Sequence, residues 1–193
     1  SLMKEYIPLL AESGKQFLVL GNMNHITFKE IFHYFRENKM WLGYNAGHFW
    51  FKVPDYYEAK NTDYKQDEDG QKWRRLGNIC WFTNMDIDIR HQFLDLYKHF
   101  SIQEYPEYDN YDAYFVKTVA DIPCDTDKPL AVPITFLSSF SPDQFELLDA
   151  NQFRKYDEVP VKSHGLIKDK DGTIKGKATY ARLLVRNRNP EKE

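Results

Sequence analysis

Two amide side chains follow the first strongly apolar stretch of the chain. Residues 17–20 form a short apolar run, and Gly21, Asn22, Met23 and Asn24 come directly after it. Ligands of open α/β sheets bind beyond the carboxyl ends of the strands, where two amides can read the polar edge of a ligand. Asn22 and Asn24 are therefore candidate binding residues. The alternative is an asparagine-rich turn that caps the following helix.

A second group of candidates is basic and lies near the C-terminus. In a β-strand, Arg182, Arg186 and Arg188 would share one face, which suits contacts with phosphates. The alternative is a solvated edge strand whose charges prevent aggregation. The candidate phosphate-binding residues are Lys175, Lys177, Arg182, Arg186 and Arg188.

Charge is distributed unevenly along the chain, although the net charge is only −3. Residues 101–150 carry two basic and ten acidic side chains, whereas residues 151–193 carry eleven basic and six acidic side chains. A general polyanion binder should be basic overall. Phosphate binding is therefore expected only at the C-terminal segment, and residues 101–150 should face away from a polyanion.

Several common active-site patterns are missing from the sequence. None of the nine glycines forms a Gly-x-Gly pair, so neither a dinucleotide fingerprint nor a phosphate loop is present. The six histidines form no His-Glu-x-x-His motif, and two cysteines are too few for a structural zinc site. Motifs alone therefore assign no catalytic, cofactor-binding or metal-binding residue.

The composition is that of an ordinary globular chain with an aromatic excess. Its 193 residues are 42% hydrophobic and 28% charged, and 14 Phe, 13 Tyr and 4 Trp give the 16% of aromatic residues. No run of 18 apolar residues predicts a membrane span. Two cysteines fit a reducing compartment, so we expect a cytoplasmic protein without a membrane partner. Some aromatic rings could stack on a planar ligand.

The first 38 residues have the order helix, strand, loop, helix. Residues 2–13 have helical spacing of apolar side chains, and residues 17–20 favour a buried parallel strand. Thr27 and Glu30 form a capping-box pattern at the start of a second helix. This order predicts a parallel α/β sheet.

The rest of the chain predicts a mixed α+β portion. Residues 40–53 are expected to form a hairpin, residues 55–75 a mobile surface loop, and residues 88–100 a helix. A short helix is expected after Ser141, and the C-terminal segment predicts a hairpin with its turn at 169–172. We divide the chain at residue 53, into 1–53 and 54–193.

Five groups of segments, in order over nearly the whole chain, resemble one family. That family is the EcoRI-type adenine-specific DNA methyltransferases of restriction–modification systems. The resembling segments are Leu-Gly-Asn-Met-Asn-His-Ile-Thr-Phe-Lys-Glu-Ile-Phe (20–32), Met-Trp-Leu-Gly-Tyr (40–44), Gly-Asn-Ile-Cys-Trp-Phe-Thr-Asn (77–84), Val-Pro-Ile-Thr-Phe-Leu (132–137) with Pro-Asp-Gln-Phe-Glu (142–146), and Gly-Lys (176–177) with 180–186.

The resemblance implies an S-adenosylmethionine site with a glycine-containing first motif and a catalytic Asn-Pro-Pro-Phe tetrapeptide. This chain contains no Pro-Pro pair and no such glycine motif, so both are expected before residue 1. In the family's chemistry the tetrapeptide holds the adenine amino group after the base has been flipped out of the duplex. The chain by itself is therefore expected to be catalytically silent.

The fold class that follows is α/β: a partial Rossmann-like methyltransferase sheet over 1–53, followed by a mixed α+β target-recognition portion over 54–193. The expected function is that of the C-terminal part of a DNA adenine-N6 methyltransferase, whose cofactor is S-adenosylmethionine. The expected partners are double-stranded DNA and the N-terminal half of the same enzyme. The alternatives are a non-catalytic remnant, a nucleic-acid-binding module and, because of the aromatic excess, a carbohydrate-binding domain.

Overall fold

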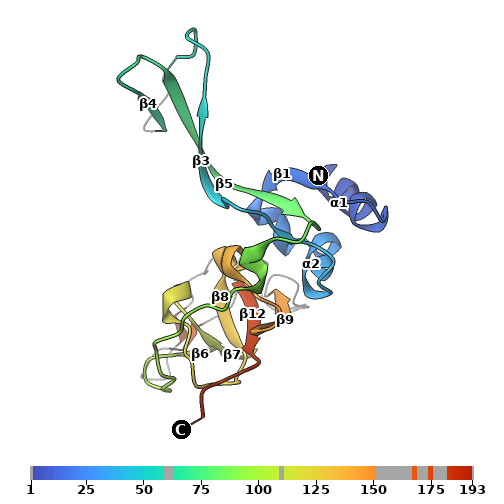
Figure 1. The fold of residues 1–193 in the computed structure, drawn as a ribbon. Helices are drawn as coiled ribbons and strands as arrows, with labels where there is room; N and C mark the ends of the chain where they lie inside the picture. Colours follow the sequence, from blue (N-terminus) through green and yellow to red (C-terminus); the bar gives the residue numbers. More distant parts are fainter. Residues whose placement is uncertain are drawn as a thin grey trace.

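The computed structural model describes residues 2–58, 63–108, 111–150, 167–168, 174–175 and 182–192. They form two β-sheets with few helices, so the predicted mixed α/β class is confirmed. Figure 1 shows a body that holds both termini and a narrow arm that projects away from it. No helix among the described residues is long and apolar enough to span a bilayer.

The N-terminal elements follow the predicted order. They are α1 (Leu2–Glu12), β1 (Leu18–Asn22), the 3₁₀ helix η1 (Met23–Thr27), α2 (Lys29–Arg36) and β2 (Trp41–Leu42). The predicted capping box is not formed, because Thr27 ends η1 and its hydroxyl donates to the Asn24 carbonyl at 3.0 Å. Phe28 is the N-cap of α2 and makes no side-chain capping bond.

The first sheet is built around one long strand, β5 (Lys72–Thr83). It lies between β1 and β2 and is antiparallel to both, so β1 and β2 run in the same direction. The prediction that β1 is a buried parallel strand is therefore wrong: its neighbour is antiparallel, and Leu18 and Leu20 are 51% and 42% exposed. The neighbour comes from sixty residues further along the chain, which a local apolar run cannot indicate.

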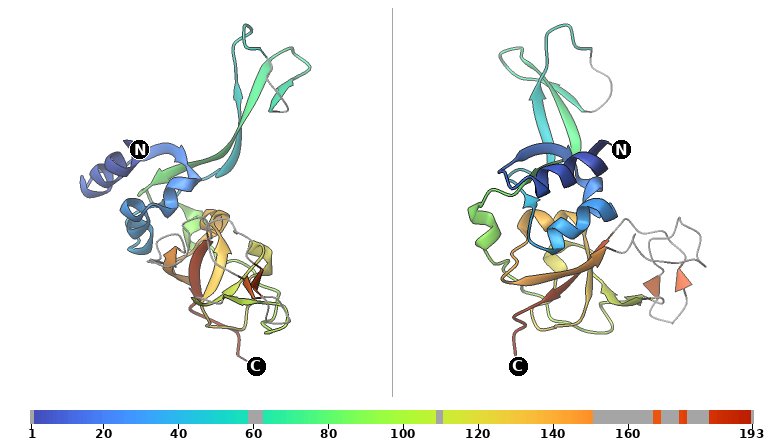
Figure 2. Two further views of the ribbon diagram at one scale, coloured as in Figure 1. Left: turned by 180° about the vertical axis from the view of Figure 1, so that it is seen from behind. Right: turned by 90° about the vertical axis from the view of Figure 1, so that its right-hand side faces the viewer.

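The projecting arm consists of β3 (Gly47–Lys52), β4 (Tyr64–Gln66) and the N-terminal half of β5. Both β2 and β3 pair with β5, so the hairpin predicted within residues 40–53 is wrong. The interpretation of residues 55–75 as a loop is also wrong where β4 pairs with residues 72–74 of β5. Both views in Figure 2 show β5 running from the arm into the body.

The segment 88–100, predicted as a helix, is helical only in the 3₁₀ turn η2 (Asp88–His91). Side chains from distant parts of the sequence bond the backbone N–H and C=O groups that would pair with each other in a helix. Gln144 bonds the N–H and the carbonyl of Leu94, and the Asp125 carboxylate accepts the N–H of Phe100 at 2.7 Å.

The second sheet has the strand order β11-β10-β6-β7-β8-β12-β9, and within it only β7 and β8 are paired parallel among the described strands. The helix predicted after Ser141 is wrong, because a turn there leads into strand β9. The predicted C-terminal hairpin is confirmed for β10 and β11, and its turn lies outside the described residues. Its second strand was expected to continue to Arg188, but the strand at 182–187 pairs with β8 and β9 instead. The strands of the second sheet and the 3₁₀ helices between them are β6 (Glu107–Tyr108), β7 (Tyr111–Phe115), η3 (Val119–Asp121), β8 (Leu130–Pro133), η4 (Ile134–Ser139), β9 (Phe145–Ala150), β10 (Ile167–Lys168), β11 (Ile174–Lys175) and β12 (Arg182–Asn187).

One hydrophobic core joins the helices and the two sheets of the body. It includes Phe35 of α2 and Phe82 of β5, together with Phe136 and Phe145 from the second sheet's portion. Phe136 and Phe145 meet edge to face, with ring centroids 5.0 Å apart. The core therefore contains residues from both sides of position 53, and the division of the chain at that residue stays a prediction.

Candidate functional site

A cavity of about 480 Å³ lies where the two sheets meet, and we call it the inter-sheet cleft. This volume is within the usual range of sites for small organic groups. The first sheet and η1 supply two amides. The second sheet and the segments that adjoin its strands supply a hydroxyl and two cations. The lining residues are Asn24, Asn78, Lys117, Pro133, Ile134, Thr135 and Arg182.

The two predicted asparagines lie at the carboxyl end of β1, as expected. Asn22 is the last residue of the strand and caps η1, because its Oδ1 accepts the N–H of Asn24 at 2.9 Å. Its Oδ1 also accepts Nδ2 of Asn78 at 3.3 Å. Asn24 is exposed and lines the cleft. Asn22 therefore caps the following turn, as the alternative interpretation expected, and Asn24 lines the cleft. Binding of a ligand by either asparagine stays a prediction.

Asn78 enters the cleft because β5 is irregular at that point. The pairing of β3 with β5 shifts between Gly47↔Ile79 and Phe49↔Leu76, and Asn78 has a left-handed φ of 60°. Asparagine tolerates this conformation better than most residues. A bulge of this kind turns a side chain out of the regular alternation of a strand. Here it occurs where β5 passes from the arm into the body.

Arg182 lies on the other side of the cleft and is mostly buried, with 8% of its surface exposed. Its Nη1 donates to the Val116 carbonyl at 2.7 Å, and its guanidinium lies 4.4 Å from the centroid of the Phe115 ring. Burial lowers the pKa of the Arg182 guanidinium from its usual value. These contacts hold β12 against the chain that leaves β7.

The other predicted basic residues are not gathered around the cleft. β12 lies between β8 and β9 rather than at an edge. Arg186 pairs with Glu146 at 3.5 Å, and Arg188 donates from Nε to the Pro142 carbonyl at 3.0 Å. Lys175 is described only as backbone of β11, and Lys177 lies outside the described residues. Contact of these five residues with phosphates stays a prediction.

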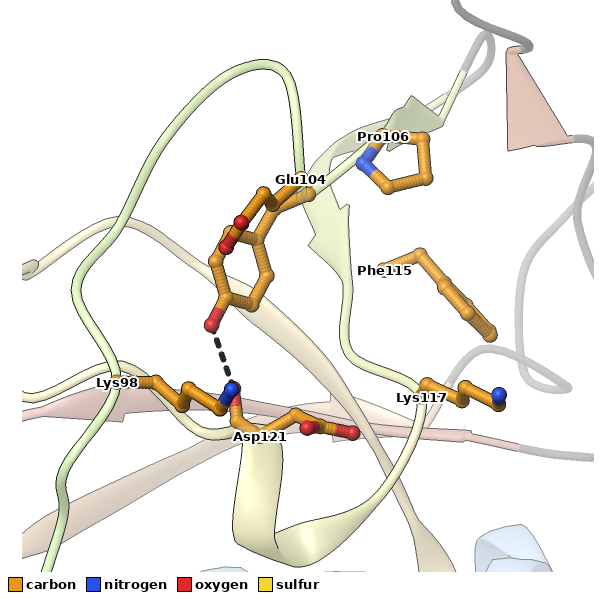
Figure 3. Close-up of a pocket in the computed structure, with 7 residues that line it drawn as sticks. Lys98, Glu104, Pro106, Phe115, Lys117 and Asp121 are labelled. Carbon is orange, nitrogen blue, oxygen red and sulfur yellow. Dashed lines mark hydrogen bonds between the residues drawn. The ribbon is translucent and has the colours of Figure 1, made fainter.

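A second cavity of about 330 Å³ lies beside the cleft (Figure 3). Tyr105 lines it and donates its hydroxyl to the Asp121 carbonyl at 2.8 Å, the bond drawn in Figure 3. Burial raises the pKa of Tyr105 to about 12. Lys117 and Phe115 also line this cavity, so Lys117 stands between it and the inter-sheet cleft.

His99, Cys124 and Asp125 bring three possible metal-ligand atoms within 4.8 Å of one another. Their bonds already have a structural role: Asp125 accepts the N–H of Phe100 at 2.7 Å and contacts His99 Nδ1 at 3.1 Å. Burial raises the pKa of the Cys124 thiol, which disfavours the thiolate that metals bind. This cluster joins the segment around residue 99 to the segment around residue 124.

Sequence reasoning missed Asn78, Lys117 and Thr135 as members of the cleft. Asn78 and Thr135 do lie in the segments 77–84 and 132–137 that carry the family resemblance, so those segments were the available signal. Lys117 lies outside every such segment. Its place in the cleft depends on the fold alone.

The family model and the individual relatives that match this chain do so over nearly its whole length. The family described as "Adenine-specific methyltransferase EcoRI" matches residues 1–188. The type II methyltransferase M.EcoRI of Escherichia coli is 40% identical over 196 residues, which cover 100% of this chain and 56% of the relative. M.MpnI of Mycoplasma pneumoniae is 35% identical, with 97% of this chain and 61% of the relative covered.

M.MgeORF184P of Mycoplasma genitalium, another type II methyltransferase, is 34% identical over 96% of this chain and 61% of its own length. The chain therefore spans a little more than half the length of the curated relatives that it matches. No solved structure gives a significant match.

Proposed function

The chain belongs to the family of the adenine-specific methyltransferase EcoRI, and from this premise we propose that it carries the DNA target recognition of such an enzyme. In this proposal the complete enzyme transfers a methyl group from S-adenosylmethionine to adenine N6 within a specific double-stranded site, in the cytoplasm of the cell. The residues of this chain recognise the site and receive the target adenine.

The observation that carries the proposal is the composition of the inter-sheet cleft. It brings together Asn24 and Asn78, which lie more than fifty residues apart in the sequence. An asparagine amide can donate to one atom of an adenine edge and accept from another, which makes it the usual partner of adenine. Lys117 also lines the cleft, and in this proposal it contacts a phosphate that flanks the base.

The cleft also supports the step that precedes methyl transfer. An adenine inside a duplex must be flipped out before its amino group can react, at a cost of a few kcal/mol in lost stacking and pairing. Hydrogen bonds from Asn24 and Asn78, with apolar contact from Pro133 and Ile134, would offset part of that cost. The role assigned to these residues is therefore to bind and orient the base.

The residues of this chain do not fit S-adenosylmethionine. The nine glycines include no Gly-x-Gly pair that could bring the backbone against the cofactor, and no Asn-Pro-Pro-Phe sequence is present to hold the amino group. The cofactor supplies the methyl group when it is bound to the complete enzyme.

The test is selection of bound duplexes from a random DNA pool by the chain, followed by sequencing. We expect enrichment of one adenine-containing site, and we expect the double variant Asn24→Ala/Asn78→Ala to lose this enrichment while it keeps non-specific binding. A loss of about 1–3 kcal/mol of discrimination is typical of one bidentate amide–adenine contact.

The control is Gln103→Ala, which removes an exposed amide outside the cleft and should leave the enrichment unchanged. If the unaltered chain enriches no site, the proposal fails. Equal enrichment by the unaltered chain and the double variant would remove the cleft asparagines from the recognition of the target.

A further inference from the structure

The arm is made of strands that have no buried core of their own. Among the described residues between 44 and 79, every side chain is exposed or only half-buried. Figures 1 and 2 show that the arm stands clear of the body. A small sheet of three strands needs a buried hydrophobic face or a packed helix for independent stability in water. This exposed ribbon is therefore better explained by a partner than by packing within the chain.

Strand register places a set of aromatic and basic side chains on one face of the arm. Trp50 pairs with Arg75, and Lys52 and Lys65 both pair with Trp73, so these five side chains point to the same side. The lysines lie over the indole rings: Lys65 Nζ is 4.6 Å from the centroid of Trp50 and Lys52 Nζ is 5.4 Å from that of Trp73. We call this surface the tryptophan face.

Charge is separated along the arm. The two main strand segments, residues 47–53 and 72–79, contain four lysines and arginines and no acidic residue. The acidic residues of the arm lie in the connecting segment 54–71. Two of these acids reach the tryptophan face: Asp63 pairs with Arg75 at 2.6 Å, and Asp67 accepts the indole N–H of Trp73 at 2.8 Å and attracts Lys52 electrostatically. Lys52 and Lys65 are exposed, and neither lies within ion-pair distance of an acid among the described residues. These two lysines are available to an anionic partner.

We propose that the tryptophan face of the arm binds along a DNA duplex, with Lys52 and Lys65 against phosphates and the two indoles against sugars or base edges. The inference rests on the proposed function, because it takes the partner to be the DNA that the cleft recognises. β5 connects the two places directly: residues 72–77 belong to the arm, and Asn78 lines the cleft. A duplex at the cleft therefore has the arm beside it.

The dimensions of the arm agree with this partner. A six-residue strand such as β3 is about 20 Å long, which corresponds to about six base pairs at 3.4 Å each. The major groove of B-form DNA is wide enough to admit a two-stranded β-ribbon, which is what the arm is where β3 pairs with residues 75–76 of β5. Over residues 72–74 of β5 the arm has a third strand, β4, and is correspondingly wider. Stacking of each lysine on an indole keeps the charge close to the surface of the ribbon.

The test compares two lysines that have the same kind of surroundings. Lys65 lies over two aromatic rings of the arm, and Lys128 lies over the rings of Phe100 and Tyr114 in the body, at 6.0 and 5.5 Å. Both lysines are exposed. We would measure the affinity of the chain and of Lys65→Ala, Lys128→Ala and Lys52→Ala/Lys65→Ala for one duplex at several salt concentrations.

Each lost phosphate contact should lower the slope of log affinity against log salt by about 0.9. We expect that decrease for Lys65→Ala, about twice that decrease for the double variant, and no change for Lys128→Ala. Circular dichroism and the thermal midpoint of each variant verify that it is folded. DNA should also change the tryptophan fluorescence of the chain, and Trp50→Phe/Trp73→Phe should abolish most of that change.

The outcomes separate the two proposals. If the unaltered chain binds no duplex, the proposed function fails and the inference about the arm fails with it. If the unaltered chain binds DNA with a salt-dependent affinity and the folded Lys52→Ala/Lys65→Ala variant has the same affinity and slope, only the arm proposal is overturned. The arm would then be a contact surface for another protein segment.

Discussion

Replacement of Arg182 by alanine should destabilise the fold rather than weaken only an electrostatic contact with a ligand. Its guanidinium is mostly buried and donates to the Val116 carbonyl at 2.7 Å and, more weakly, to the Lys117 carbonyl at 3.4 Å. It also covers the Phe115 ring at 4.4 Å. Arg182→Ala removes all three contacts at once and leaves the buried Val116 carbonyl without this donor.

The magnitude follows from these contacts. A hydrogen bond from a charged donor contributes about 1.5–3 kcal/mol, and a partly desolvated cation–π contact contributes about 1–2 kcal/mol. Burial of the charge opposes this gain, in agreement with the lowered pKa of Arg182. We therefore expect a loss of about 2–4 kcal/mol in the free energy of unfolding.

Urea denaturation followed by circular dichroism measures this quantity. The matched control is Arg186→Ala on the same strand, because the Arg186 side chain is 44% exposed and makes only a surface ion pair with Glu146. Such pairs contribute about 0–1 kcal/mol. Equal free energies of unfolding for the two variants would refute the structural role of Arg182.

Two further predictions concern the first sheet and the buried tyrosines. Gly21→Ala should lower the free energy of unfolding by about 1–3 kcal/mol, because a Cβ there would lie 2.4 Å from Cε2 of the buried Phe82 ring. Thermal denaturation measures this loss, and an unchanged thermal midpoint would contradict the prediction. Burial raises the pKa of Tyr34 and of Tyr105 to about 12, above the usual value of 10, so their contribution to stability is complete below pH 10 and is lost as the pH rises through 12. Urea midpoints between pH 9 and 12 should fall less steeply for Tyr34→Phe/Tyr105→Phe than for the unaltered chain.

The sequence predicted best the features that depend on neighbouring residues. The helices around residues 2–12 and 29–36, the strand that ends at Asn22 and the C-terminal hairpin all follow from apolar spacing and turn residues close to them. Asn24 lies beyond that strand, as expected, and lines the cleft, whereas its role in binding stays a prediction. Each of these features is determined within about ten residues.

Features that depend on distant bonds were not predicted. Residues 92–100 have the apolar spacing of a helix, but Gln144 and Asp125 bind their backbone from elsewhere in the fold. The antiparallel partner of β1 comes from residues 79–83, and the Thr83 hydroxyl strengthens that pairing by donating to the Phe17 carbonyl at 2.7 Å. No local pattern indicates which of several segments will make such contacts.

The basic residues illustrate why charge counts along a sequence can misplace an interface. The C-terminal segment has the largest positive excess, yet Arg182 is buried and Arg188 donates to backbone carbonyls of the turn at residues 142–145. The arm has no net excess over residues 47–79, since its six acids offset its six lysines and arginines. Its register nevertheless leaves Lys52 and Lys65 exposed on one face, while all six acids lie in the connecting segment 54–71. Phosphate binding depends on which charges share a surface and are free of intramolecular partners, and only the fold sets both conditions.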